Sequence, residues 1–203
     1  MHSNRVRYQR LLREAEGYLE LGLPHMAIET LHKVDEPGTL KSKQLYLLGE
    51  AFRAQGRFQE AIEVLQASVE KTPSKIDIYL ALGWCYKRTD RLDLAIEALQ
   101  KGLEIEPGQP ILHYNLACYW SLAGNKDQAL QCLSEALRRD PDYREMISDE
   151  HDFDSLATSC AKVHELLAVP RNPSSHHHEC HESTLQHSDW HDPATGATCW
   201  DSQ

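Results

Sequence analysis

The sequence predicts an all-α protein built as an array of antiparallel helix pairs. Three observations support this prediction: an alanine recurs every 34 residues, a leucine follows each alanine, and an aromatic residue precedes it. The alanines are Ala27, Ala61, Ala95 and Ala129, the leucines Leu31, Leu65, Leu99 and Leu133, and the aromatic residues Tyr18, Phe52, Tyr86 and Trp120. A period of this length indicates stacked copies of one supersecondary unit.

Two further residue classes keep the same period. The small residues are Ala15, Gly49, Gly83 and Ala117, and the prolines are Pro73, Pro107 and Pro141. We therefore divide the chain into four repeats, 8–41, 42–75, 76–109 and 110–143.

The third repeat shows how each unit forms two helices. Apolar residues at helical spacing predict a first helix over 76–86, which Ser74 can cap. Asp90 lies in the turn that follows, and a second helix over 92–103 ends before Pro107.

Small residues have a packing reason at these positions. Two antiparallel helices approach closely only where the facing side chains are small, as at Gly83 and Ala95, with Tyr86 and Leu99 filling the space around them. The turn between the helices favours a residue with positive φ. That turn position holds Gly22, Gly56, Asp90 and Gly124.

These residues resemble the tetratricopeptide repeat (TPR) over 8–143. The matching features are a small residue at repeat position 8, an aromatic residue at 11, alanine at 20, a large apolar residue at 24 and proline at 32. Repeat one departs from the pattern, with Glu14 at position 7 and an early Pro37. The resemblance implies a right-handed superhelical array whose first helices line a concave groove that binds another protein.

The C-terminal part departs from the repeat register. Residues 144–168 resemble the degenerate repeat that closes many bacterial TPR arrays, with an acidic run at 150–156, and we expect a helix there that caps the last repeat. Residues 169–203 are rich in Pro, Ser, His and Asp without helical period, and we expect them to be disordered.

The resemblance and helical geometry together predict which residues face the groove. Repeat positions 2, 5, 9 and 12 lie opposite the packed positions of each first helix. We select, from these positions and their neighbours, Tyr46, Glu50, Arg53, Leu80, Trp84, Lys87, Arg88, Tyr114, Asn115 and Cys118. Aromatic residues and arginine often dominate interface energies, and this set suits a peptide or helix with apolar anchors and acidic character. The alternative is that the aromatic residues pack against neighbouring first helices.

A carboxylate clamp of the kind some TPR domains use for a chaperone C-terminus is not expected. That clamp needs Lys and Asn at positions 5 and 9 of one repeat, Asn at 6 of the next, and Lys and Arg at 2 and 6 of the third. The two possible registers offer instead Leu12, Glu16, Leu47, Asp77 and Ala81, or Tyr46, Glu50, Ala81, Ile111 and Asn115.

Two groups of residues have the chemistry of a reactive or metal site. His176, His177, His178, Cys180 and His181 are suitable zinc, copper or nickel ligands, but they lack the paired spacing of structural zinc sites. A metal-handling protein acting through this tail is therefore our alternative function. His151 lies among carboxylates, which we attribute to a helix N-terminus rather than to acid–base catalysis. With no phosphate-binding loop or nucleophile elbow, we expect neither an enzyme nor a cofactor.

Composition limits the partners. The net charge of −10 without a basic stripe argues against nucleic acid, and no apolar stretch is long enough to span a bilayer. The charged N-terminus shows no secretory signal, and the six cysteines form no disulfide pattern, so we expect a cytoplasmic protein. The sequence predicts an adaptor or scaffold that binds another protein, as a monomer or weak homo-oligomer.

Overall fold

The computed structural model describes residues 2–34, 39–147 and 151–153. Its helices are α1 (His2–Glu20), α2 (Pro24–Leu31), α3 (Thr39–Ala54), α4 (Phe58–Lys71), α5 (Ile76–Arg88), α6 (Leu92–Ile105), α7 (Pro110–Leu122), α8 (Lys126–Arg139) and α9 (Tyr143–Ile147), with a 3₁₀ turn η1 (His151–Phe153). The described residues contain no strand, and the prediction of an all-α fold is confirmed.

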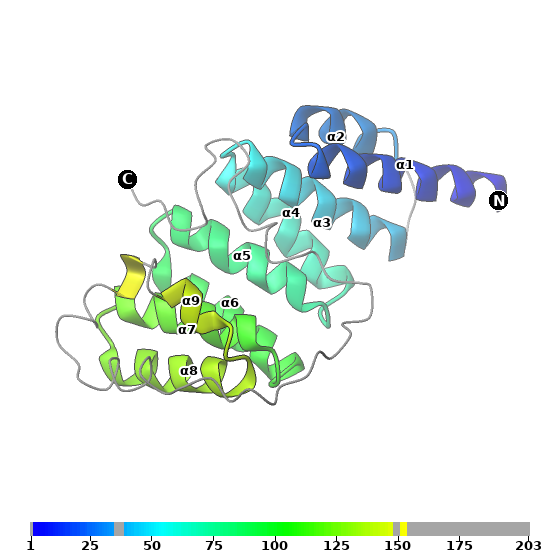
Figure 1. Ribbon diagram of the computed structural model, residues 1–203. Helices are drawn as coiled ribbons and strands as arrows, with labels where there is room; N and C mark the ends of the chain where they lie inside the picture. Colours follow the sequence, from blue (N-terminus) through cyan, green and yellow to red (C-terminus); the bar gives the residue numbers. More distant parts are fainter. Residues whose placement is uncertain (1, 35–38, 148–150, 154–203) are drawn as a thin grey trace.

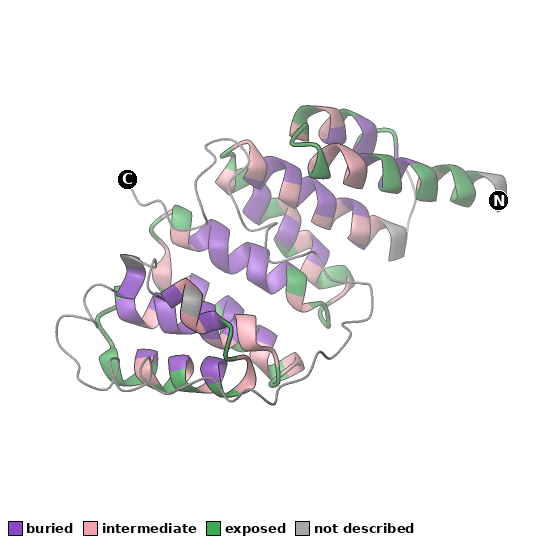
Figure 2. Cartoon of the chain, viewed as in Figure 1, coloured by how far each residue is buried: buried purple, intermediate pink, exposed green. Residues whose placement is uncertain are grey.

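The helices stack in chain order. From α1 to α8 each helix packs against the next, and α3 also packs against both α1 and α5. Figure 1 shows the pairs following one another from the N-terminus to α7 and α8. Buried residues gather on the facing sides of α3 to α7, whereas much of the outer surface of α1 and α8 is exposed (Figure 2). Such nearest-neighbour stacking is typical of a solenoid.

The two helices of each pair meet at the small residue. A Cβ added to Gly49 would lie 2.5 Å from Cγ of Leu65, and one added to Gly83 would lie 3.1 Å from Cδ2 of Leu99. In repeats one and four the corresponding residues are fully buried, as Ala15 with Leu31 and Ala117 with Leu133. The predicted role of the small residues is therefore confirmed.

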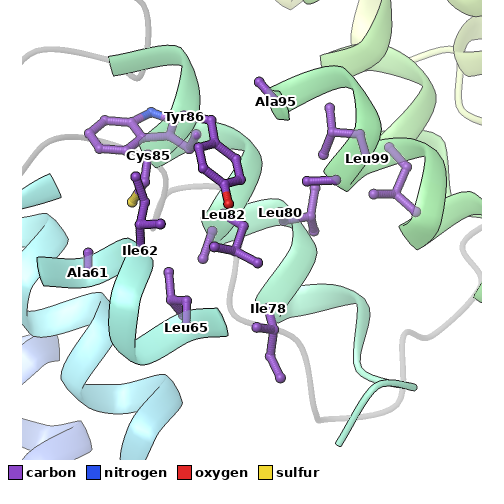
Figure 3. Packing of buried hydrophobic residues seen from close by; sticks show 14 of the residues in the cluster. Ala61, Ile62, Leu65, Ile78, Leu80, Leu82, Cys85, Tyr86, Ala95 and Leu99 are labelled. Atoms are coloured by element: carbon purple, nitrogen blue, oxygen red, sulfur yellow. The ribbon is translucent and has the colours of Figure 1, made fainter. Parts of the chain in front are cut away.

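Helix α5 lies at the centre of the core. It packs between α4, which contributes Ala61, Ile62 and Leu65, and α6, which contributes Ala95 and Leu99 (Figure 3). All nine residues of α5 from Ile78 to Tyr86 are buried. A first helix in the middle of the stack is thus covered on more than one side.

One hydrogen bond closes the turn in every repeat. The backbone N–H of the residue that precedes each second helix donates to the carbonyl of the aromatic residue at position 11. These bonds are Leu23 to Tyr18 (2.8 Å) and Arg57 to Phe52, Arg91 to Tyr86 and Asn125 to Trp120 (each 2.9 Å). The residue directly before each donor has positive φ, namely Gly22, Gly56, Asp90 (φ 56°) or Gly124. This is the Schellman arrangement, and it confirms the predicted turn.

The prolines separate successive pairs. Helices α4, α6 and α8 end shortly before Pro73, Pro107 and Pro141. The carbonyl of Pro73 accepts a hydrogen bond from Tyr79 Oη (2.9 Å), and that of Pro107 lies 3.0 Å from His113 Nε2. Each of these contacts ties the start of a first helix to the preceding loop.

The predicted cap at Ser74 is wrong. Helix α5 begins after Lys75, whose side chain makes no capping hydrogen bond. A side-chain cap is present instead at Asn125, which accepts from the backbone N–H of Gln128 (3.3 Å) before α8.

The first repeat is held to the second by a buried glutamine. Gln44 Nε2 donates to the carbonyl of Leu31 (2.7 Å), which ends the short helix α2, and to that of Val34 (2.9 Å), which follows the helix. Helix α3 begins at Thr39, before the boundary at residue 42 that the sequence suggested. In the predicted closing segment 144–168, the structure describes the rest of α9 and η1; the residues after 153, including the expected capping helix and the tail, lie outside the described residues.

Gly49→Ala is expected to lower the free energy of unfolding by about 1 kcal/mol. Overpacking against the fully buried Leu65 costs about 1–3 kcal/mol, which exceeds the helix-propensity gain of up to about 1 kcal/mol. Gly17 in α1 is the matched control because an added Cβ meets nothing within 4 Å. Thermal unfolding should therefore show a lower melting temperature for Gly49→Ala and a higher one for Gly17→Ala. Equal stabilisation by the two substitutions would contradict the close contact between Gly49 and Leu65.

Asp90→Gly is expected to stabilise the protein by up to about 1 kcal/mol. Asp90 holds the left-handed turn position that glycine holds in the other three repeats, and this conformation costs a residue with Cβ about 1–2 kcal/mol. Chemical denaturation measures the change. Gly56→Ala, which adds a Cβ at the same turn position of repeat two, should destabilise the protein. A destabilising effect of Asp90→Gly would show that the aspartate side chain stabilises the turn.

Candidate functional site

The candidate site is the face made by repeat positions 5, 9 and 12 of α3, α5 and α7, which we call the first-helix face. It comprises Tyr46, Glu50, Arg53, Leu80, Trp84, Lys87, Tyr114, Cys118 and Ser121. Of the ten groove residues that the sequence predicted, six are buried, namely Arg53, Leu80, Trp84, Tyr114, Asn115 and Cys118. Tyr46, Glu50 and Lys87 are half-buried and Arg88 is exposed. These six buried side chains can contact a partner only if the residues that cover them move. Their role in binding therefore stays a prediction.

An ion pair lies on the α3 part of this face. Arg53 donates from Nη2 and Nε to both carboxylate oxygens of Glu50, at 2.8 and 3.2 Å. Burial by itself would lower the pKa of Arg53, but the charge of Glu50 and its hydrogen bonds outweigh that effect and raise it. The two hydrogen bonds orient the pair within α3.

Trp84 packs against several elements of the core. Its ring meets Phe58 of α4 edge-on at 5.2 Å between centroids, and the guanidinium of Arg53 lies 5.0 Å above it. Arg88 also lies over both rings, 5.6 Å from Trp84 and 5.3 Å from Phe58. In this structure Trp84 packs against neighbouring helices, which corresponds to the alternative that the sequence left open.

The N-terminal part of the first-helix face is more open. Tyr46 is only partly buried, and desolvation, followed by the charge of Glu50, raises the pKa of its hydroxyl. Next to it in α3, Lys43 forms an ion pair with Glu16 of α1 at 2.7 Å, with side chains 41% and 34% exposed. Polar and charged groups are thus accessible between α1 and α3.

The C-terminal part is covered by α9 and η1. The Tyr114 ring lies 4.9 Å from that of Tyr143 in α9 and meets Phe153 of η1 edge-on at 5.9 Å. Burial, followed by the charge of Asp140, raises the pKa of Tyr143. The two short elements therefore enclose Tyr114, which sequence analysis had placed on an open surface.

Asp152 joins α5 and α7. Its Oδ2 lies 2.5 Å from Nζ of Lys87, and Ser121 Oγ donates to its backbone carbonyl at 2.5 Å. The sequence predicts the acidic run at a helix N-terminus, and Ser121 is not among the ten predicted groove residues. The available signal was the spacing, since Ser121 stands 34 residues after Lys87, at the same repeat position.

The described cysteines have the surroundings of structural thiols. Burial, followed by the charge of Glu50, raises the pKa of Cys85 to about 12, and burial raises that of Cys132 to about 11. Cys118 is fully buried. Thiols with raised pKa values are poor nucleophiles. The metal-ligand candidates His176 to His181 lie outside the described residues, and within the described residues no cluster of three or more His, Cys, Asp or Glu side chains is placed to hold a metal ion.

Comparison with protein families identifies the repeat. A tetratricopeptide repeat model matches residues 52–116 and 90–148, which contain the helices from α4 to α9 and the turns at Gly56, Asp90 and Gly124. The chain is a tetratricopeptide repeat protein. This confirms the sequence-based resemblance. No curated protein matches the chain significantly, and none of the described helices is long and apolar enough to cross a membrane.

Solved structures show the same TPR fold. Two crystal structures of MamA superpose with TM-scores of 0.61 and 0.60 at 28% and 27% identity, covering 68% and 71% of this chain and 81% and 79% of theirs. YrrB, described as a TPR protein with an unusual peptide-binding site, superposes with a TM-score of 0.57 at 20% identity, covering 64% of this chain and 66% of its own.

Arg53→Met is expected to lower the free energy of unfolding by about 3 kcal/mol, because it leaves the Glu50 carboxylate without its partner in a desolvated site. The side chains of Arg53 and Glu50 are 7% and 15% exposed. The pair Glu135–Arg138 has the same spacing on the surface of α8, so Arg138→Met should change stability little. Urea unfolding compares them, and Glu50→Gln added to Arg53→Met should recover part of the loss. Equal effects of the two arginine variants would contradict the assigned burial.

Proposed function

We propose that this TPR protein is an adaptor that binds a peptide segment of another protein on its first-helix face. The observation that carries the proposal is that aromatic and charged side chains recur at positions 5, 9 and 12 of the successive first helices α3, α5 and α7. Binding on a prefolded array needs little ordering of the protein, which lowers the cost of association.

The open part of this face suits a mixed polar and apolar contact. Tyr46 offers an amphipathic ring, and the ion pair between Lys43 and Glu16 offers charges of both signs at partial exposure. Tyrosine is enriched among residues that dominate binding energy. The peptide-binding site ascribed to YrrB, which shares this fold, supports the choice of a peptide as ligand. TPR arrays are typically scaffolds rather than enzymes, and the described cysteines fit that assignment.

The test is partner capture by face and control variants. Tyr46→Ala with Lys43→Glu changes the open part of the face and the ion pair beside it, while Gln100→Ala with Lys71→Glu makes a truncation to alanine and the same charge reversal at exposed positions of α6 and α4. Loss of a tyrosine hot spot costs about 2 kcal/mol or more, which is a fall in affinity of more than about tenfold.

Partners are first identified by affinity purification of the full chain from its native cell and mass spectrometry. Their affinity for purified wild-type and variant proteins is then measured by biolayer interferometry. Circular dichroism confirms that both variants fold. Equal binding by the face variant and the control variant would reject the first-helix face as the binding site.

A further inference from the structure

The chain places its own Asp152 and Phe153 on the face proposed for the partner. Lys87 and Ser121, which both contact Asp152, occupy position 12 of consecutive first helices, α5 and α7. In a regular array a further repeat contacts only its neighbour. Such a repeat would follow α8 and would not reach α5. Through η1 the chain therefore turns back over the face rather than simply extending the stack.

The contacts of Asp152 include a side-chain ion pair and a main-chain hydrogen bond. Its carboxylate pairs with Lys87, whose side chain is 14% exposed, and its carbonyl accepts from Ser121. Hydrogen bonds between ionised groups are about twice as strong as neutral ones, and the main-chain bond fixes the segment without reading its sequence. Asp152 itself is almost fully buried. These are the contacts by which a face recognises an acidic residue within a peptide.

Phe153 supplies the apolar half of the same contact. It is 2% exposed and meets Tyr114 edge-on, while Tyr143 covers another part of the Tyr114 ring. Edge-to-face aromatic pairs add about 0.5–1.5 kcal/mol beyond the area they bury. Adjacent subsites on α5 and α7 thus accept a carboxylate and an aromatic ring from consecutive residues.

Resting on the proposed function, we propose that the partner peptide carries an acidic residue followed directly by an aromatic residue, and that it competes with Asp152 and Phe153 for this site. A 3₁₀ turn as short as η1 gains little stability of its own, so its position depends on these contacts. Because it is tethered, it competes at an effective concentration on the order of millimolar. The chain therefore lowers the apparent affinity of its own site.

The test uses a fluorescent peptide with the sequence of residues 150–156, EHDFDSL, and the full-length chain. Fluorescence anisotropy compares wild-type protein with the variant Asp152→Ala, Phe153→Ala. We expect the peptide to bind the variant at least tenfold more tightly. A peptide with Ala in place of the Asp–Phe pair should bind neither protein.

A charge exchange tests the lysine contact. When Lys87→Glu is added to the Asp152→Ala, Phe153→Ala variant, binding of EHDFDSL should weaken at least tenfold. A peptide with Lys in place of the Asp that corresponds to Asp152 should restore binding to this triple variant. Failure of the recovery, or equal binding of EHDFDSL to wild type and to a folded Asp152→Ala, Phe153→Ala variant, would overturn the proposal. If that double variant does not fold, Asp152→Asn replaces it and retains the side-chain shape. Binding at least threefold tighter than wild type then supports the proposal, and equal binding overturns it.

The two proposals fail separately. A partner that binds the Asp152→Ala, Phe153→Ala variant no more tightly than wild type, yet is lost on Tyr46→Ala with Lys43→Glu, would leave the adaptor function in place and overturn the competition. A partner insensitive to Tyr46→Ala with Lys43→Glu would reject the adaptor site itself, whatever the peptide does.

Discussion

The close contact between the two helices of each repeat is the constraint on which the rest of the structure depends. At Gly49 there is no room for a further carbon atom beside the leucine of the second helix, and at Gly83 the contact is close enough that the leucine would have to shift. Because the same contact recurs in each pair, the pairs share one geometry and stack in one register. That register brings position 12 of α5 close enough to position 12 of α7 for one residue, Asp152, to contact both.

The fold could be predicted because its determinants lie within one repeat and recur. The positive φ of Asp90 follows from the glycines at the same place in the other repeats, and the helix ends follow from the prolines. The cap predicted at Ser74 failed because Lys75, not Ser74, directly precedes α5, and the repeat period does not specify the first helical residue that closely. Element type is therefore encoded more strongly here than the chemistry of each helix end.

The candidate site could be predicted only in part. Helical geometry gives the side of α5 on which Trp84 lies, but coverage depends on residues distant in sequence, such as Phe58. The contact between Lys87 and Asp152 spans 65 residues and lies outside the repeat register, so periodicity gave no indication of it. A repeat pattern shows where a face is but not which segment of the chain covers it.

The charges of the first-helix face are already engaged within the chain. Arg53 is paired with Glu50, and Lys87 with Asp152. A ligand that only approaches Lys87 gains little, because it must first replace a carboxylate and its buried surroundings; a ligand with the same chemistry exchanges one set of contacts for another. The net binding free energy is then the difference between the contacts that the ligand makes and those that η1 makes at the same site. A ligand displaces η1 only to the extent that it binds the uncovered face better than the covered one. Under the proposed competition, additional contacts elsewhere, as near Tyr46, would decide whether a partner displaces η1.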